Sequence, residues 1–419
     1  DGSFEDLFFV IERELANRIG ISVSGKLHTG RSRNDMEHTM FRMVLKQKLI
    51  ENLELHESLV EKLIHKAGNN LEEIILLYTH GQPAQPSTLA HYLGAVIEVI
   101  LRDMERIYSA LQNVDLCPMG AAAITTSGFN VDRELMAELL GFHDCVENSY
   151  GAIAACDYIT ASYSVVKLSC INLGRFVQDL ASWTGFEISQ LYVPDGFVQI
   201  SSIMPQKRNP VPVEHMRLMF SLASGGAEQI IETMHNTPFA DMNDSERETQ
   251  SNGHQVFDRM KRALLLLSGF VEAIEVDQSS VNKRIDASLA TITELADSIV
   301  RNEKISFRQA HQIAHKIAQT SIEQQKSLQE FSFEEYCCFF KSEIGDNAKM
   351  KPGIFNQISD PKHFVAVRKL RGGPSRESML ESLQKYREKG ESYIEKITVK
   401  KTRMKLAVNQ REQGAKNLM

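Results

Sequence analysis

Apolar residues recur at spacings of three and four over long stretches of this chain. Between residues 45 and 67, six apolar positions follow this spacing with Glu and Lys between them, which predicts an amphipathic helix. From Asp157 to Trp183, apolar residues cover nearly the whole circumference, which predicts a helix buried on several sides. The segments Val213–His235 and Val256–Ile274 have a similar pattern. These segments indicate several long, largely buried helices.

Proline is scarce and clustered, which leaves room for such helices. The chain has 11 prolines in 419 residues, and none precedes Pro83. None lies between Pro118 and Pro194, and the stretch from residue 239 to residue 351 has none either. Because proline removes a backbone N–H and clashes with the preceding turn, these tracts can stay helical. Alternation with period two is rare and there is no βαβ rhythm. The predicted fold class is therefore all-α, with a long central helical bundle.

The expected organisation has three regions. Residues 1–90 would form an N-terminal helical region, residues 91–320 a central long-helix domain, and residues 321–419 a C-terminal helical region. The chain starts at Asp1 without Met or a leader-like stretch, so we expect that an N-terminal segment is missing from its start.

Composition and charge narrow the classes of partner. Apolar residues make up 42% and charged residues 24%, as in an ordinary globular protein, and no apolar run approaches the length of a membrane span. The net charge is −7 and the one long basic run is Lys396–Lys405, which argues against a nucleic-acid partner. The six cysteines form no CxxC pair, which predicts reduced thiols and a cytoplasmic location.

Three loops gather the residue types that carry chemistry: Gly25–Asp35, Tyr78–Pro86 and Ser201–Pro210. The third has two hydroxyls, their backbone N–H groups, a lysine and an amide between stiffening prolines, a set that suits a dicarboxylate. Each loop alone also fits an ordinary role: a helix cap at Ser32 or Asn34, a structural histidine, or a solvated loop. The residues by themselves leave these alternatives open.

The complete strings in these loops resemble those of the argininosuccinate lyase family within the fumarase/aspartase superfamily. SSIMPQKRNP resembles the superfamily's signature loop, and its MPQK form is most similar to argininosuccinate lyases. KLHTGRSRND and THGQPAQP are similar to two further family segments. Similar stretches are residues 5–20, 117–120, 129–142 and 360–374. The resemblance thus covers almost the whole chain.

What the resemblance implies is an all-α homotetramer whose active sites are each assembled from three subunits. The implied reaction is a β-elimination that splits a C–N bond of an N-substituted aspartate and releases fumarate. Argininosuccinate is the first expected substrate. The implied partners are this small-molecule substrate and the other subunits, with no membrane or nucleic acid. No metal or organic cofactor is implied, and no ligand spacing in the sequence suggests one.

The resemblance also implies roles for individual residues. Ser201 would be the base, with Lys207 and the N–H groups around Ser202 and Ile203 stabilising its alkoxide. His80 would protonate the leaving nitrogen or support the developing charge, and Glu214 would orient it. The residues implied to bind substrate are Ser32, Arg33, Asn34, Thr79, Gln82, Ser202, Met204 and Asn209.

The chain departs from the family pattern at three places. Ile200 precedes the signature loop where the family usually has Gly, and Gly151 and Cys156 stand where Asp and Arg are usual. The segment 237–248 lacks the Tyr, Gln and Lys that hold the arginine end in argininosuccinate lyases. The acidic residues in that segment's place are Asp241, Asp244 and Glu246. These changes predict an altered pocket for the amine half, unless they are plain drift in a loop.

Two alternatives follow from these departures. One is a paralogue that cleaves another N-substituted aspartate, such as an aminopolycarboxylate of the ethylenediamine-disuccinate type. Adenylosuccinate fits less well, because its lyases differ around Gly25–Asp35. The other is a non-catalytic, crystallin-like structural relative, although such a protein need not keep the serine loop and His80.

Overall fold

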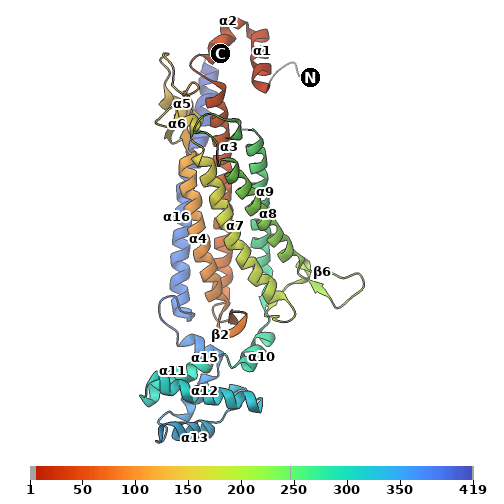
Figure 1. Ribbon diagram of the computed structural model, residues 1–419, viewed down its shortest axis with the longest axis vertical. Coiled ribbons are helices and arrows are strands. Elements are labelled where there is room, and N and C mark those ends of the chain that lie inside the picture. The colour runs from red at the N-terminus through yellow and green to blue at the C-terminus, as the bar shows by residue number, and fades with distance from the viewer. Residues whose placement is uncertain (1–5, 246, 418–419) are drawn as a thin grey trace.

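Long helices dominate the structure, a computed structural model that describes residues 6–245 and 247–417 (Figure 1). The longer helices are α1 (Leu7–Ile19), α3 (Arg33–Asn69), α4 (Leu89–Val114), α5 (Arg133–Leu140), α7 (Asp157–Thr184), α8 (Val211–Thr233), α9 (Arg247–Ala273), α10 (Gln278–Ser288), α11 (Ile292–Glu303), α12 (Phe307–Gln324), α13 (Phe333–Ile344) and α16 (Arg376–Asn417). The shorter helices are α2 (Ile21–Ser24), α6 (Gly151–Ala154), α14 (Pro352–Ile358), α15 (Pro361–Ala366) and the 3₁₀ turns η1 (Gly25–His28), η2 (Asp195–Phe197), η3 (Asn243–Ser245) and η4 (Leu328–Glu330). The strands are β1 (Ile74–Thr79), β2 (Gln82–Thr88), β3 (Leu116–Cys117), β4 (Asp144–Cys145), β5 (Leu191–Tyr192), β6 (Gln199–Ile200), β7 (Arg208–Asn209) and β8 (Glu275–Val276).

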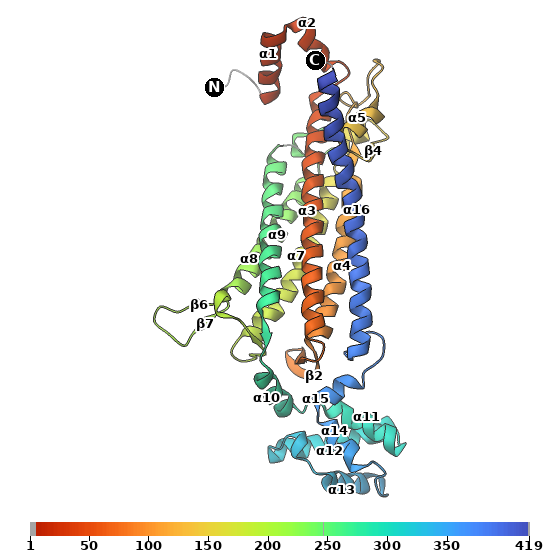
Figure 2. The same ribbon diagram turned by 180° about the vertical axis from the view of Figure 1, so that it is seen from behind.

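The central element of the fold is a bundle of α3, α4, α7, α8, α9 and α16, which run side by side (Figures 1 and 2). Their apolar faces form one continuous core, in which Leu49, Leu53 and Val166 are fully buried. The four helices predicted from periodicity coincide with parts of α3, α7, α8 and α9, so the all-α bundle prediction is confirmed. Two predicted ends, His235 and Ile274, lie just beyond the ends of α8 and α9. Among the described residues, no helix combines the length and apolarity needed to cross a bilayer.

A smaller group of helices, α10 to α15, lies at one end of the bundle (Figure 1). Part of this group has its own apolar core, which includes Ile299, Ile317 and Tyr336. The buried Glu294 carboxylate of α11 accepts a hydrogen bond from Arg368 at 2.9 Å, which fixes the segment after α15 to this group. The chain then returns along the bundle as α16. The proposed division at residues 90 and 320 stays a prediction.

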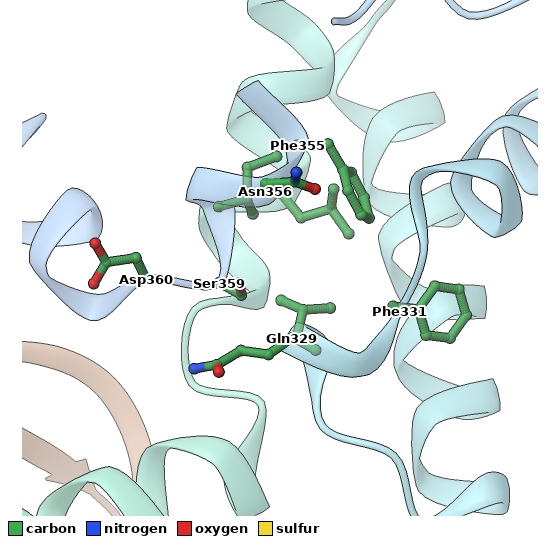
Figure 3. Close-up of a pocket in the computed structure, with 9 residues that line it drawn as sticks. Gln329, Phe331, Phe355, Asn356, Ser359 and Asp360 are labelled. Atoms are coloured by element: carbon green, nitrogen blue, oxygen red, sulfur yellow. The ribbon is translucent and has the colours of Figure 1, made fainter. Parts of the chain in front are cut away.

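A pocket of about 560 Å³ lies in this end group, between α11, η4 and α14 (Figure 3). Its lining mixes apolar side chains such as Phe355 with polar ones such as Gln329 and Asp360. None of the residues that the sequence assigns to the active site lines it. The predicted active-site residues therefore lie elsewhere on the chain.

A buried charge cluster joins both ends of the sequence inside the bundle. Asp115, at the end of α4, is 1% exposed and accepts from Lys46 of α3 at 2.9 Å and from Lys400 of α16 at 2.5 Å. Lys46 also donates to the Gly141 carbonyl at 2.6 Å and lies 4.3 Å from the centre of the Phe142 ring. Burial lowers the pKa of Lys46, and Asp115 opposes that shift. Removing one partner would leave an uncompensated buried charge, so this cluster fixes how α3, α4 and α16 pack.

A second buried polar contact lies deeper in the bundle. His56 of α3 is fully buried, with Nδ1 2.7 Å from the Asn52 carbonyl and Nε2 2.7 Å from the Ser169 hydroxyl of α7. Both contacts fit a neutral imidazole that donates from Nδ1 and accepts at Nε2. Burial lowers the pKa of His56 to about 4.

This depressed pKa predicts that stability falls as pH drops from about 6.5 towards 4, because only the unfolded chain readily binds the proton. Between pH 7 and 5 the expected loss from this one group is about 2 kcal/mol. The His56→Gln variant should lose correspondingly less over the same range, as measured by urea unfolding at both pH values. His65→Gln, which changes an exposed histidine of the same helix, is the control. An unchanged pH dependence in His56→Gln would contradict the assignment.

Candidate active site

The first predicted loop leads into the start of α3. Ser32 is the N-cap residue: its hydroxyl accepts from the Asn34 N–H at 3.3 Å, and the Asp35 carboxylate accepts from the Ser32 N–H at 2.9 Å. This reciprocal pair is a capping box, so Ser32 has the helix-capping role that the sequence left open. Because the cap fixes the first turn, it also fixes where Arg33 and Asn34 lie.

Asp35 additionally connects this turn to a strained loop. Its other carboxylate oxygen accepts from the N–H groups of Gly120 at 3.1 Å and Ala122 at 3.0 Å. Ala122, Ala123 and Thr126 have positive φ angles of 46°, 76° and 64°. Non-glycine residues in this region cost about 1–2 kcal/mol each, so the buried Asp35 contributes to holding a conformation that the loop would not adopt alone. Such strain next to a candidate binding turn is typical of functional sites.

Two carboxylates contact the predicted binding residues of this turn. Arg33 pairs with Asp6 at 2.6 Å. The Asn34 side-chain amide donates to Asp241 Oδ2, which lies in the segment that replaces the family's arginine-binding residues. Of the acidic residues named there, Glu246 lies outside the described residues. The contact shows that the segment 237–248 and the Arg33–Asn34 turn meet within one chain.

His38, one turn further along α3, extends this polar group into the bundle. Its Nε2 lies 3.7 Å from Asp241 Oδ1, and its Nδ1 lies 3.1 Å from the Tyr158 hydroxyl. The Arg42 guanidinium lies 3.7 Å from the centre of the Tyr158 ring. Burial lowers the pKa of His38, and the neighbouring Asp241 carboxylate opposes this shift. Burial prevails, so the imidazole is mainly neutral at pH 7.

The second predicted loop is the tip of a β-hairpin, an element that the periodicity analysis did not predict. β1 and β2 pair antiparallel, with Thr79 opposite Gln82. The two tip residues, His80 and Gly81, have φ angles of 53° and 74°, which is the pattern of a two-residue type I′ turn. The hairpin therefore carries Thr79, His80 and Gln82 on an exposed tip.

The signature loop is also a hairpin tip, between β6 and β7, and it projects sideways from the bundle (Figure 1). The Ser201 hydroxyl oxygen accepts from the N–H groups of Ile203 at 3.4 Å and Met204 at 3.1 Å. The sequence had suggested the N–H groups around Ser202 and Ile203, so the Met204 N–H takes the place of one of them. Ile200, the departure from Gly, lies in β6 opposite Arg208 and needs no left-handed backbone.

Arg208 and Asn209 mainly hold this hairpin together. Arg208 pairs with Asp195 at 2.5 Å and donates to the Val193 carbonyl at 2.8 Å. Asn209 donates its amide to the Gln199 carbonyl at 3.0 Å. Ser202, Met204 and Lys207 are exposed, and Glu214 is exposed on the first turn of α8. Within the described residues, Glu214 makes no ion pair with His80.

The geometry keeps the three clusters apart within one chain. The Ser32–Asn34 turn lies at one end of α3, and the His80 hairpin follows the other end of that helix (Figure 1). With 37 residues at 1.5 Å each, α3 separates them by about 55 Å. The serine hairpin projects from the side of the bundle, so one chain does not bring the predicted residues together.

Sequence reasoning missed two residues of this region. His38 gave no signal because it lies inside an amphipathic helix, where a lone histidine is ordinarily structural. Asp241 was noticed as a departure, but its contact with Asn34 joins residues 207 positions apart and could not be inferred from spacing. The left-handed residues of the loop after Met119 are visible only in the backbone.

The chain is similar to known proteins along most of its length. The lyase family profile matches residues 6–225, and the argininosuccinate lyase C-terminal profile matches residues 289–366. Argininosuccinate lyase 2 of Agrobacterium fabrum is 50% identical over 388 residues, which are 93% of this chain and 77% of that protein. An argininosuccinate lyase of Methanosarcina acetivorans is 34% identical, over 90% of this chain and 76% of the relative.

Among solved structures, EDDS lyase in complex with formate superposes with a TM-score of 0.88 at 26% sequence identity. The match covers 96% of this chain and 80% of the solved one. The two profiles, the sequence identity over most of the chain and the shared helical bundle all indicate the same family. The chain belongs to the argininosuccinate lyase family of the fumarase/aspartase superfamily.

Proposed function

We propose that this protein is a carbon–nitrogen lyase that converts an N-substituted aspartate into fumarate and an amine, with argininosuccinate as the first candidate substrate. The observation that carries the proposal is the serine hairpin, in which two backbone N–H groups converge on the Ser201 oxygen. Two such donors would stabilise an alkoxide, the form in which a serine can act as a base. The 50% identity to an argininosuccinate lyase supports the same reaction.

In this mechanism Ser201 removes a proton from the carbon next to one carboxylate. The electron pair left on that carbon forms the new C=C bond as the C–N bond breaks, and the nitrogen leaves with a proton from His80 or from a group that His80 supports. The proton lost by carbon is balanced by the proton gained by nitrogen. The products are fumarate and the free amine.

The remaining predicted residues are proposed to hold the two carboxylates. Lys207 is exposed on the serine hairpin, where its ammonium group can approach the charge that builds up during elimination. Arg33, Asn34 and Thr79 supply donors at the other two clusters. The proposed roles of Ser32, Asn209 and Glu214 are less well supported. The Ser32 hydroxyl already caps α3, and the Asn209 amide already donates to the Gln199 carbonyl within the serine hairpin.

The wide separation of the three clusters implies a site shared between subunits. Clusters about 55 Å apart along one rigid helix can meet only if different chains place them side by side. The central helices carry exposed apolar residues suited to such association, including Leu168 at 44%, Leu218 at 55% and Leu222 at 45% exposure. We therefore propose a homotetramer whose sites each combine three chains.

A second candidate substrate is an aminopolycarboxylate of the ethylenediamine-disuccinate type. Two observations favour it: the similarity to the EDDS lyase structure and the absence of the family's Tyr, Gln and Lys from residues 237–248. Losing a hydrogen-bond partner for a polar group typically costs about 1–3 kcal/mol. Argininosuccinate would then be bound less well unless other residues replace those contacts.

Fumarate release, followed by ultraviolet absorbance, tests the proposed function directly. We expect fumarate from at least one member of a panel containing argininosuccinate, ethylenediamine-disuccinate and simple N-alkylaspartates. If no other residues replace the two or three absent binding partners, kcat/KM for another adduct should equal or exceed that for argininosuccinate. Efficient cleavage of argininosuccinate with every other adduct at least a hundredfold slower would remove the altered-pocket interpretation. Failure on the whole panel would contradict the lyase proposal and favour a structural relative.

Ser201→Ala should lower kcat by at least about 10²–10⁴-fold, because the base is lost. The melting temperature should hardly change, since the hydroxyl bonds only within its own exposed hairpin. Ser201→Asn is the matched variant: its side-chain oxygen can accept the same N–H groups but cannot act as the base. It should be equally inactive. Retention of more than a tenth of the activity in either variant would exclude Ser201 as the base.

Mixing two inactive variants tests the shared site. His80→Asn and Ser201→Ala place their defects on different hairpins, so mixed tetramers should contain some sites with neither defect. We expect partial recovery of activity after the subunits are dissociated and reassembled together. Each variant reassembled alone serves as the control, and subunit exchange is verified by mass. Absence of recovery in verified mixed oligomers would argue for sites built from a single chain.

A further inference from the structure

The Asp241 carboxylate lies directly against the turn that is proposed to bind a substrate carboxylate. The Asn34 amide donates to Asp241 Oδ2, so the nitrogen side of that amide faces the aspartate. An amide nitrogen has two N–H donors, and only one is used in this contact. Asn34 can therefore hold a substrate carboxylate while Asp241 stays in place beside it.

The second oxygen of Asp241 accepts no hydrogen bond from the described residues. Oδ1 is buried and has no hydrogen-bond partner, and its 3.7 Å separation from His38 Nε2 is too long for a hydrogen bond. Burial keeps the pKa of His38 low, so this imidazole does not bring a full positive charge. Among the side chains that the structure describes, no Lys or Arg forms an ion pair with Asp241. Among the described side chains, its negative charge is thus only weakly compensated.

The segment that carries Asp241 is anchored against the body of the protein. The Tyr150 hydroxyl donates to the Phe239 carbonyl at 2.7 Å, and the two rings lie 5.9 Å apart. At the other side of Asp241, Thr249 donates to the Asp244 carbonyl at 2.6 Å. These contacts hold the carboxylate next to Asn34 rather than leaving it on a free loop.

The chemistry of the substrate places its amine half close to this charge. In an N-substituted aspartate the leaving nitrogen is bonded to the carbon that carries one carboxylate. A residue beside the carboxylate-binding turn therefore lies near the nitrogen and the group attached to it. A cationic group there would gain a charge partner in the Asp241 carboxylate, whereas a further carboxylate would be repelled.

We propose that Asp241 determines the charge preference of the amine half, favouring substrates with a cationic group there and disfavouring those with a further carboxylate. The proposal rests on the proposed lyase function and specifies the substrate class of that same site. It also separates the two candidate substrates. The arginine half of argininosuccinate carries one carboxylate but both a guanidinium and an ammonium group, whereas ethylenediamine-disuccinate carries a second pair of carboxylates on its amine half.

A matched pair of substrates tests this. N-(2-aminoethyl)aspartate and N-(2-carboxyethyl)aspartate are similar in length but carry opposite charges on the amine half, and N-propylaspartate is the neutral reference. In the unmodified protein we expect kcat/KM to be at least tenfold higher for the aminoethyl adduct than for the carboxyethyl adduct. Asp241→Asn keeps an acceptor for Asn34 but removes the charge, so this ratio should fall at least tenfold.

Asp346→Asn is the control, because it makes the same chemical change at an exposed position of the distant end group and should leave the ratio unaltered. Asp241→Ala provides a second neutral variant if Asp241→Asn melts at a lower temperature. A preference of the unmodified protein for the carboxyethyl adduct, or an unchanged ratio in both neutral variants, would overturn the proposal. In either case fumarate is still released, so the lyase function survives. If the unmodified protein releases fumarate from no adduct, the lyase function fails and the proposal with it.

Discussion

The rigid length of α3 is the constraint on which the rest of the molecule depends. The helix carries one predicted substrate-binding turn at its start, and a second cluster follows its end, about 55 Å away. No side-chain motion closes such a distance, so a single chain does not bring these predicted clusters together. The proposed homotetramer would explain why the central helices expose apolar residues and why the hairpin tips are exposed in a single chain.

Much of the fold could be predicted because the long helices carry a strong periodic signal. The predicted helix Asp157–Trp183 differs from α7 by one residue at its end. The β1–β2 hairpin was missed because its residues, Ile74–Thr88, do not alternate between apolar and polar side chains. The left-handed turn at His80 and Gly81 is visible only in the backbone. The motif residues were found by resemblance, whereas the contact between Asn34 and Asp241 arises only from tertiary packing.

Three carboxylates of this chain differ in how many of their oxygens accept hydrogen bonds. Asp35 accepts three backbone N–H groups and fixes the strained loop to the start of α3. Glu303 likewise accepts from Tyr336 and from two backbone N–H groups near Met350. Asp241 differs from these two because one of its oxygens is buried without a donor. The carboxylates that use both oxygens as acceptors stabilise structure, whereas Asp241 lies beside the predicted binding turn with one oxygen unpaired.

The Asp115 cluster has a consequence for the order in which the protein can fold during synthesis. Lys46 and Asp115 are made early, but Lys400 follows 285 residues later. Until α16 has left the ribosome, one oxygen of Asp115 lacks its partner, and the apolar faces of α3 and α4 that α16 covers stay open to water. The nascent bundle therefore depends on protection, by chaperones or by its own partial collapse, until the segment around residue 400 arrives.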